Sequence, residues 1–179
     1  MSSSTHSAMI MAGGTGGHVY PGLAVASELR EAGWRVSWIG TARGLEARVV
    51  PVSGMTLHTL TTLGLRGKGI LSRLKGVFSL LFACLQALGL LLRHRPTLVI
   101  GFGGYAAGPA GAVATMLRIP VLIHEQNAVA GTTNRLLARG ACRVMAGFEG
   151  AFALSANALV TGNPLRAELC QQPQKAYPQ

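Results

Sequence analysis

Four glycines, a threonine and a histidine stand close together near the start of the chain, in the order Gly13, Gly14, Thr15, Gly16, Gly17 and His18. The apolar residues 9–12 before them predict a strand, and residues 21–32 after them predict a helix. A strand-to-helix turn of this kind directs backbone N–H groups and the positive end of a helix dipole at a ligand, which favours phosphate. His18 could accept a proton from a hydroxyl group, donate a hydrogen bond to phosphate, or serve only in packing.

Two further polar groups follow predicted strands. Gly103, Gly104 and Tyr105 come after the apolar residues 97–100, and Glu125 and Asn127 come after residues 119–124. Glu125 could act as a general base, accept a hydrogen bond from a sugar hydroxyl, or pair with an arginine, and Tyr105 could bind a ligand or cap its helix. Because the carboxyl ends of parallel strands meet at one edge of a sheet, we expect these groups to lie near His18.

Strands and helices alternate along the whole chain, and the strands are continuously apolar. This pattern predicts an α/β fold, a Rossmann-like parallel sheet with helices on both faces. Strands are expected at 35–39, 55–60, 97–100, 119–124, 142–146 and 158–161, and helices at 45–50, 70–93, 106–117 and 132–139. Residues 1–7 are expected to be disordered, residues 8–170 to form one domain, and the Gln/Pro-rich residues 171–179 to begin an interdomain linker.

Composition limits the kinds of ligand. Lys and Arg number 16 against 6 Glu and no Asp, so the net charge is +10 and an anionic partner is expected. The lack of aspartate argues against a metal site, and aromatic residues do not alternate with basic ones as in nucleic-acid platforms. A dinucleotide cofactor is also disfavoured, because the third glycine of that motif would fall at Val19. We therefore expect no metal, no cofactor and no nucleic acid, and the three scattered cysteines fit a cytosolic compartment.

The segment from Ile70 to Arg95 predicts a long helix whose central sixteen residues, 77–92, are nearly all apolar. A spanning helix needs about 20 apolar residues, and crossing a bilayer here would divide the sheet. Basic residues flank the segment on both sides, which favours a helix lying on an anionic membrane surface. A plain buried helix and a spanning helix remain the alternatives.

Five motifs occur in order: residues 11–24 around the first glycine turn, Gly-Leu-Arg-Gly-Lys-Gly at 64–69, Gly-Phe-Gly-Gly-Tyr at 101–105, His-Glu-Gln-Asn at 124–127 and Gly-Asn-Pro-Leu-Arg at 162–166. Together they resemble the N-terminal half of the MurG family. The resemblance implies the acceptor-binding half of an inverting GT-B glycosyltransferase. That enzyme moves N-acetylglucosamine (GlcNAc) from UDP-GlcNAc to the C4 hydroxyl of MurNAc in undecaprenyl-diphospho-MurNAc-pentapeptide. It also implies a peripheral protein on the cytoplasmic face of the bacterial inner membrane.

The same resemblance assigns roles to residues. His18 corresponds to the proposed catalytic base, with Glu125 as the next candidate. Contacts to UDP-GlcNAc are implied for Thr15, Gly16, Gly17, Asn127 and Arg166. Contacts to the acceptor and its diphosphate are implied for Gly13, Gly14, Gly103, Gly104, Tyr105 and Asn134.

The donor-binding C-terminal domain of that family is not in this sequence, so we expect no turnover by this chain alone. The missing half could stand on the same protein or on a separate chain. The alternative is a non-catalytic module that binds diphospholipid at the membrane surface.

Overall fold

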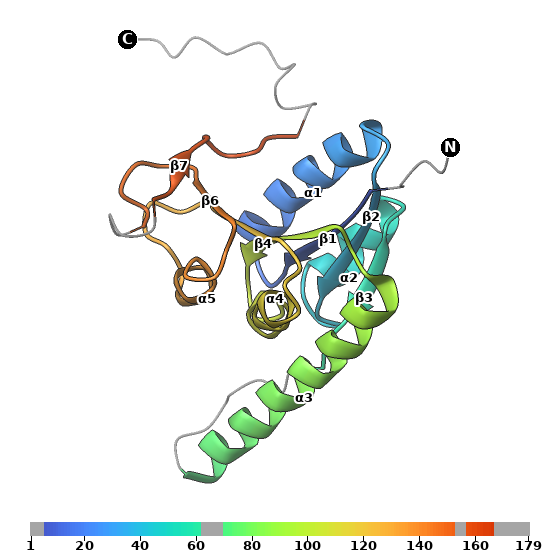
Figure 1. The fold of residues 1–179 in the computed structure, drawn as a ribbon, viewed down its shortest axis with the longest axis vertical. Coiled ribbons are helices and arrows are strands. Elements are labelled where there is room, and N and C mark those ends of the chain that lie inside the picture. Colours follow the sequence, from blue (N-terminus) through green and yellow to red (C-terminus); the bar gives the residue numbers. More distant parts are fainter. Residues whose placement is uncertain (1–5, 62–69, 153–156, 167–179) are drawn as a thin grey trace.

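The computed structural model describes residues 6–61, 70–152 and 157–166, which form a seven-stranded sheet in the order β3-β2-β1-β4-β5-β6-β7 (Figure 1). All six strand pairings are parallel. The strands are β1 Ser7–Ala12, β2 Arg35–Gly40, β3 Thr56–Thr59, β4 Leu98–Gly103, β5 Val121–Glu125, β6 Arg143–Ala146 and β7 Leu159–Val160. The predicted α/β, Rossmann-like class is therefore confirmed.

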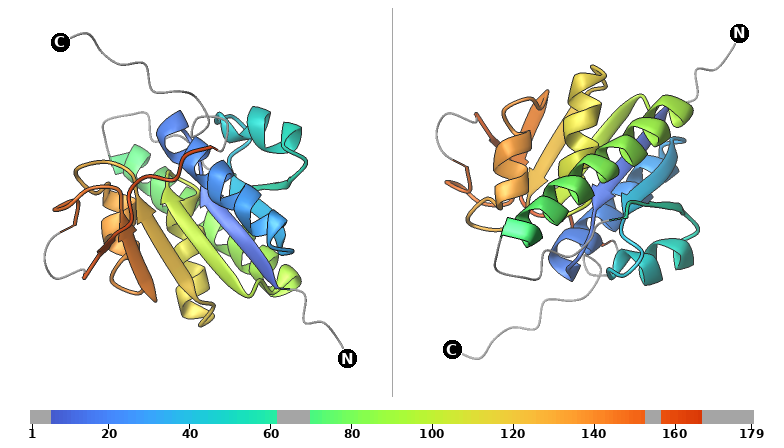
Figure 2. Two further views of the ribbon diagram at one scale, coloured as in Figure 1. Left: turned by 90° about the horizontal axis from the view of Figure 1, so that it is seen from above. Right: turned by 90° about the horizontal axis from the view of Figure 1, so that it is seen from below.

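The described part of the chain has five helices, which cover the two faces of the sheet: α1 Gly16–Glu31, α2 Glu46–Val52, α3 Ile70–His94, α4 Ala107–Met116 and α5 Thr132–Leu137. Alternate strand residues point to opposite faces, which divides the core in two. Met9 and Met11 pack with α3, α4 and α5, whereas Ile10 and Ala12 pack with α1 and α2. Figure 2 shows the two helical layers from above and below.

Two predicted boundaries differ from the structure. Ser7 lies in β1, where its N–H donates to Thr97 Oγ1 at 3.1 Å, so it is not part of a disordered terminus. Helix α1 begins at Gly16 instead of residue 21, because extended Thr15 offers its carbonyl to the N–H groups of His18 and Val19. Pro21 costs this helix one hydrogen bond without ending it. The motif at 64–69 and the expected linker at 171–179 lie outside the described residues.

Helix α3 has one buried side and one exposed side. Ala83, Ala87 and Leu91 are at most 1% exposed and pack in the core, whereas Phe78 and Leu81 are 69% and 56% exposed. The helix also extends beyond the sheet (Figures 1 and 2). Its 21 residues 74–94 are long and apolar enough to cross a membrane by composition. One side of α3 completes the core, so a spanning position would remove that side from the sheet. Within the described residues the other side of α3 is exposed.

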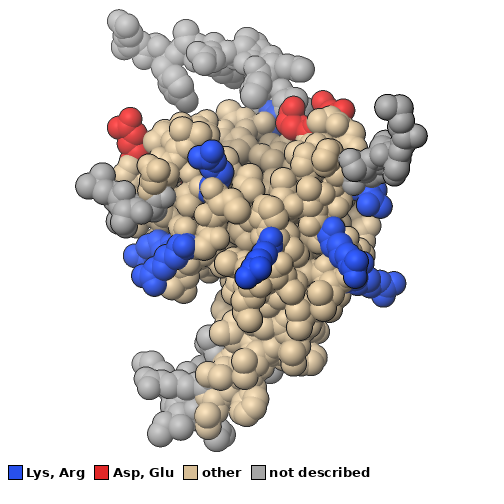
Figure 3. All heavy atoms as spheres, in the orientation of Figure 1, with Lys and Arg blue, Asp and Glu red and all other residues tan. Residues whose placement is uncertain are grey.

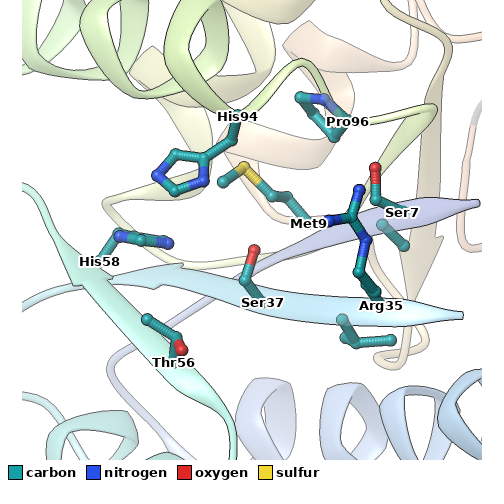
Figure 4. A pocket seen from close by; sticks show the side chains of 10 residues that line it. Ser7, Met9, Arg35, Ser37, Thr56, His58, His94 and Pro96 are labelled. Atoms are coloured by element: carbon teal, nitrogen blue, oxygen red, sulfur yellow. The ribbon is translucent and has the colours of Figure 1, made fainter. Parts of the chain in front are cut away.

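The amino ends of β1, β2 and β3 border a pocket of about 240 Å³ next to the end of α3 (Figure 4). The rings of His58 and His94 lie 4.5 Å apart there, with Arg35 on the other side. Burial, followed by the charges of His94 and Arg93, lowers the pKa of His58. None of the predicted site residues lines this pocket, so the candidate site lies at the opposite, carboxyl edge of the sheet.

Candidate active site

The two glycine turns meet where the strand order reverses, between β1 and β4. Ala12 at the end of β1 pairs with Gly103 at the end of β4, after a register shift between Met11 and Ala12. Gly104 has φ +91°, and a Cβ atom there would overlap the backbone of Gly13. The two loops are therefore in direct backbone contact, which requires glycine at position 104. This is the position where sheets of this type bind ligands.

The first loop, residues 13–15, is held from behind by the Glu46 carboxylate. The Glu46 side chain is fully buried, and it accepts hydrogen bonds from Gly14 N (2.9 Å), Thr41 N (2.8 Å) and Thr41 Oγ1 (2.8 Å). A Cβ atom at Gly13 would also collide with this carboxylate. Gly14 N is thus occupied by protein and Gly13 must be glycine, so part of the glycine pattern is explained by the Glu46 brace.

The carbonyl of Ala12 is satisfied by Trp38 in the neighbouring strand. The indole Nε1 donates to Ala12 O at 2.8 Å, and Trp38 is fully buried. The register shift at the end of β1 disrupts the regular ladder at this carbonyl, and a buried carbonyl without a donor is costly. Neither Glu46 nor Trp38 was predictable as a supporting residue, because a lone acid in a short helix and a tryptophan in a strand form no motif.

His18 lies in the first turn of α1, half-buried, between the two loops. Its Nδ1 is 3.4 Å from Thr15 Oγ1. Its Nε2 is 3.1 Å from the position that a Cβ atom on Gly103 would take, and Asn134 Nδ2 is 3.5 Å from the same position. The structure therefore brings His18 to the second glycine turn, as the strand-end argument predicts, and Asn134 from α5 approaches the same glycine.

Glu125 is 1% exposed, and both of its oxygens are occupied. Oε1 accepts from Asn127 N at 3.0 Å and Asn127 Nδ2 at 2.7 Å, and Oε2 accepts from Gly131 N at 3.0 Å and Asn134 Nδ2 at 2.9 Å. Burial raises the pKa of this carboxyl, but the four hydrogen bonds outweigh burial and hold the pKa below its usual value. A buried carboxylate with no free oxygen is suited to positioning Asn127 and Asn134. The geometry favours this positioning role over the alternative of Glu125 as the base.

His124 fastens the segment that leaves the sheet after β7. Its Nε2 lies 3.0 Å from Gly162 O and its Nδ1 lies 3.1 Å from Gln126 Nε2, which assigns the proton to Nε2. Burial lowers the pKa of His124, although the Gly162 carbonyl and the Glu125 charge act in the opposite direction. A neighbouring bond from Asn163 Nδ2 to Gln126 O, 3.1 Å, holds the same segment.

Beyond Asn163 the chain crosses the carboxyl edge of the sheet to reach α1 (Figure 2, left). The Arg166 guanidinium lies over the ring of Tyr20, 4.9 Å from its centroid, and that ring lies against Gly16. Arg166 is thus beside the first glycine loop, whereas exposed Asn127 is held at the end of β5 by Glu125. Tyr105 is 45% exposed and borders an apolar hollow between α3, α4 and α5.

The described residues include no group of three His, Cys, Asp or Glu side chains that could hold a metal ion. A parallel sheet in this strand order, with glycine loops and a histidine at the reversal point, fits the Rossmann-like domain of a GT-B glycosyltransferase. The model of the glycosyltransferase family 28 N-terminal domain matches residues 8–146, and the chain belongs to this family.

Close relatives share one name: UDP-N-acetylglucosamine–N-acetylmuramyl-(pentapeptide) pyrophosphoryl-undecaprenol N-acetylglucosamine transferase. The protein from Methylococcus capsulatus is 56% identical over 158 residues, covering 88% of this chain and 45% of the relative. The protein from Tolumonas auensis is 52% identical over 172 residues, covering 94% and 48%. A crystal structure of Acinetobacter baumannii MurG superposes with a TM-score of 0.79 at 40% identity, covering 95% of this chain and 50% of that one. The chain thus spans about half the length of these relatives.

Proposed function

We propose that this chain is the acceptor-binding half of an enzyme that transfers GlcNAc from UDP-GlcNAc to the C4 hydroxyl of MurNAc in undecaprenyl-diphospho-MurNAc-pentapeptide. The observation that carries the proposal is the contact between the two glycine loops, with His18 between them. The names of the relatives supply the substrates. The acceptor diphosphate is assigned to the loops that contain Gly13, Gly14, Gly103 and Gly104, next to Tyr105 and Asn134.

His18 is the proposed base. If Nδ1 donates its proton to Thr15 Oγ1, the Nε2 lone pair faces the second glycine loop. The acceptor hydroxyl then loses its proton to Nε2 while its oxygen attacks C1 of GlcNAc, and the bond from C1 to UDP breaks on the opposite side. Glu125 acts by positioning Asn127 and Asn134. Thr15, Gly16, Gly17, Asn127 and Arg166 are the proposed donor contacts from this half.

The proposed function can be tested by adding a donor-binding half from a relative. Mixing the chain with the C-terminal half of the Methylococcus capsulatus relative should give GlcNAc transfer to a lipid I analogue, and neither half alone should react. In the two-part enzyme, His18→Ala should lower kcat by about 10²–10⁴. His6→Ala is the matched control, because His6 is exposed and stacks on Trp34 outside the site. Diphospholipid binding without any transfer by the mixture would favour the non-catalytic module.

Peripheral attachment to the cytoplasmic face of the inner membrane is part of the proposal. The exposed side of α3 is apolar. Most of the lysine and arginine side chains visible in Figure 3 lie on the lower half of the body, beside the point where α3 leaves it, and the acidic ones lie along the upper margin. An apolar face with nearby positive charge fits an anionic lipid surface.

Co-sedimentation with anionic vesicles tests this attachment. Replacing both Phe78 and Leu81 by serine should weaken vesicle binding about tenfold or more, because two exposed apolar side chains no longer enter the lipid. Val52→Ser on α2 is the control, since Val52 is 88% exposed on the other face of the sheet. Raising the salt concentration should weaken binding of every variant. Equal binding by the double variant and the control would contradict the assignment to α3.

A further inference from the structure

A groove of about 550 Å³ lies between α3, α4 and α5. Its walls include Leu80 and Cys84 from α3, Pro109 and Ala112 from α4, and Leu136 from α5, and Tyr105, Thr115, Thr132 and Thr133 also line it. None of the described residues that line it is charged. The volume and the apolar walls are those of a small-molecule site with few polar groups.

The groove borders two features of different chemistry. Leu80 and Cys84 continue into the exposed apolar side of α3, which carries Phe78 and Leu81. Tyr105 directly follows Gly103 and Gly104 in the loop that contacts Gly13. The groove therefore connects the site assigned to a diphosphate with the helix assigned to the membrane surface.

We infer that the groove binds the first isoprene units of the polyprenyl chain attached to the acceptor diphosphate. The inference rests on the proposed function and adds a chain-binding subsite to it. We expect an uncharged and mostly apolar occupant, because none of the described lining residues is charged and hydroxyl groups are the only side-chain oxygen or nitrogen groups among them. It must carry its charge at one end, because the groove borders both Tyr105, which follows the glycine loop, and the apolar side of α3.

Two positions on α4 allow a matched test. Ala112 is exposed and lines the groove, so Ala112→Trp should fill the groove without disturbing the core. Met116 lies one turn further on the same helix, is 82% exposed and does not line the groove. Met116→Trp therefore introduces the same side chain outside it. Leu136→Ser, at an exposed wall residue, is a second variant that removes apolar surface.

The experiment is calorimetric titration of the chain with pyrophosphate, geranyl diphosphate, farnesyl diphosphate and farnesol, all below their micelle concentrations. Affinity should rise about tenfold with each isoprene unit, because each unit buries apolar carbon. Ala112→Trp should bring the affinity for farnesyl diphosphate to within about threefold of that for pyrophosphate. Met116→Trp should leave the increase in affinity with chain length unchanged, and Leu136→Ser should reduce that increase in part.

The outcomes separate this inference from the proposed function. If farnesyl diphosphate binds no more tightly than pyrophosphate, the groove does not bind the isoprene chain. That result leaves the assignment of the diphosphate to the glycine loops unaffected. A chain-length gain that survives Ala112→Trp also overturns it, because the chain then binds elsewhere. Farnesol binding that Ala112→Trp abolishes, without any binding of pyrophosphate, supports the groove and counts against the diphosphate assignment.

Discussion

Two loops at the carboxyl edge of the sheet are each built around a buried carboxylate. Glu46 braces the first glycine loop, and Glu125 braces the loop after β5; their side chains are 0% and 1% exposed. The donors differ. Two of the three donors to Glu46 are backbone N–H groups and the third is the Thr41 hydroxyl. Two of the four donors to Glu125 are the side-chain amides of Asn127 and Asn134.

The kind of donor decides what each carboxylate holds in place. A carboxylate that accepts from backbone N–H groups fixes the path of the chain, whatever side chains the loop carries. A carboxylate that accepts from amide side chains fixes the side chains themselves, and here one of them, Asn134, approaches Gly103 together with His18. In both cases several hydrogen-bond donors among the described residues offset the cost of burying the carboxylate.

Replacing Glu46 or Glu125 by alanine should give the largest losses in the free energy of unfolding. Glu46→Ala should lower the free energy of unfolding by about 3–4 kcal/mol, because it leaves part-buried donors unpaired and opens a cavity. Glu125→Ala should cost less, about 2–3 kcal/mol, because Asn127 is exposed and its two donors can turn to water. Urea unfolding measures both. Glu149→Ala is the control, since Glu149 is exposed, and a Glu46→Ala loss no larger than the control's would show that Glu46 is not a brace.

Replacement by glutamine should reverse this order. Glu46 Oε2 accepts one hydrogen bond, so a glutamine can place its NH₂ group there and lose one bond, about 1–2 kcal/mol. Each oxygen of Glu125 accepts two, so either orientation of a glutamine sets an NH₂ group against two donors, at about 2–3 kcal/mol. Urea unfolding of the two glutamine variants in parallel checks the order. If Glu46→Gln lowers the free energy of unfolding more than Glu125→Gln does, the proposed difference between the two braces is wrong.

The residues around Glu125 could be predicted from the sequence, whereas the role of Glu46 could not. Glu125, Asn127 and Asn134 lie within ten residues of one another, directly after an apolar strand, so their proximity follows from local geometry. Glu46 is 32 residues from Gly14 and opens a short helix of ordinary composition. Only the pairing of β1 with β2 and the turn after β2 bring the two together, and that is a property of the assembled sheet.

The fold itself was predictable because its strands are apolar and regularly spaced by helices. The approach of His18 to Gly103 followed from the rule that strand ends meet at one edge. The start of α1 did not follow, since proline commonly opens helices and here Pro21 lies inside one. The contact of Arg166 with Tyr20 was also beyond sequence reasoning, because it depends on how the chain crosses the edge after β7.

The smallest expected effect is on the pH dependence of the free energy of unfolding, and it concerns His124 beside the second loop. Because the pKa of His124 is lower in the folded chain than in the unfolded chain, the unfolded chain binds more protons as pH falls below about 6.5, and stability falls with it. His124→Gln can keep a donor toward Gly162 O but cannot titrate, so its free energy of unfolding should fall less between pH 7.5 and pH 5.5. His58 contributes the same slope to both proteins, and Glu125, with its lowered pKa, stays charged in this range. Urea unfolding at several pH values gives the two curves, and parallel curves would mean that His124 does not link the second loop to pH.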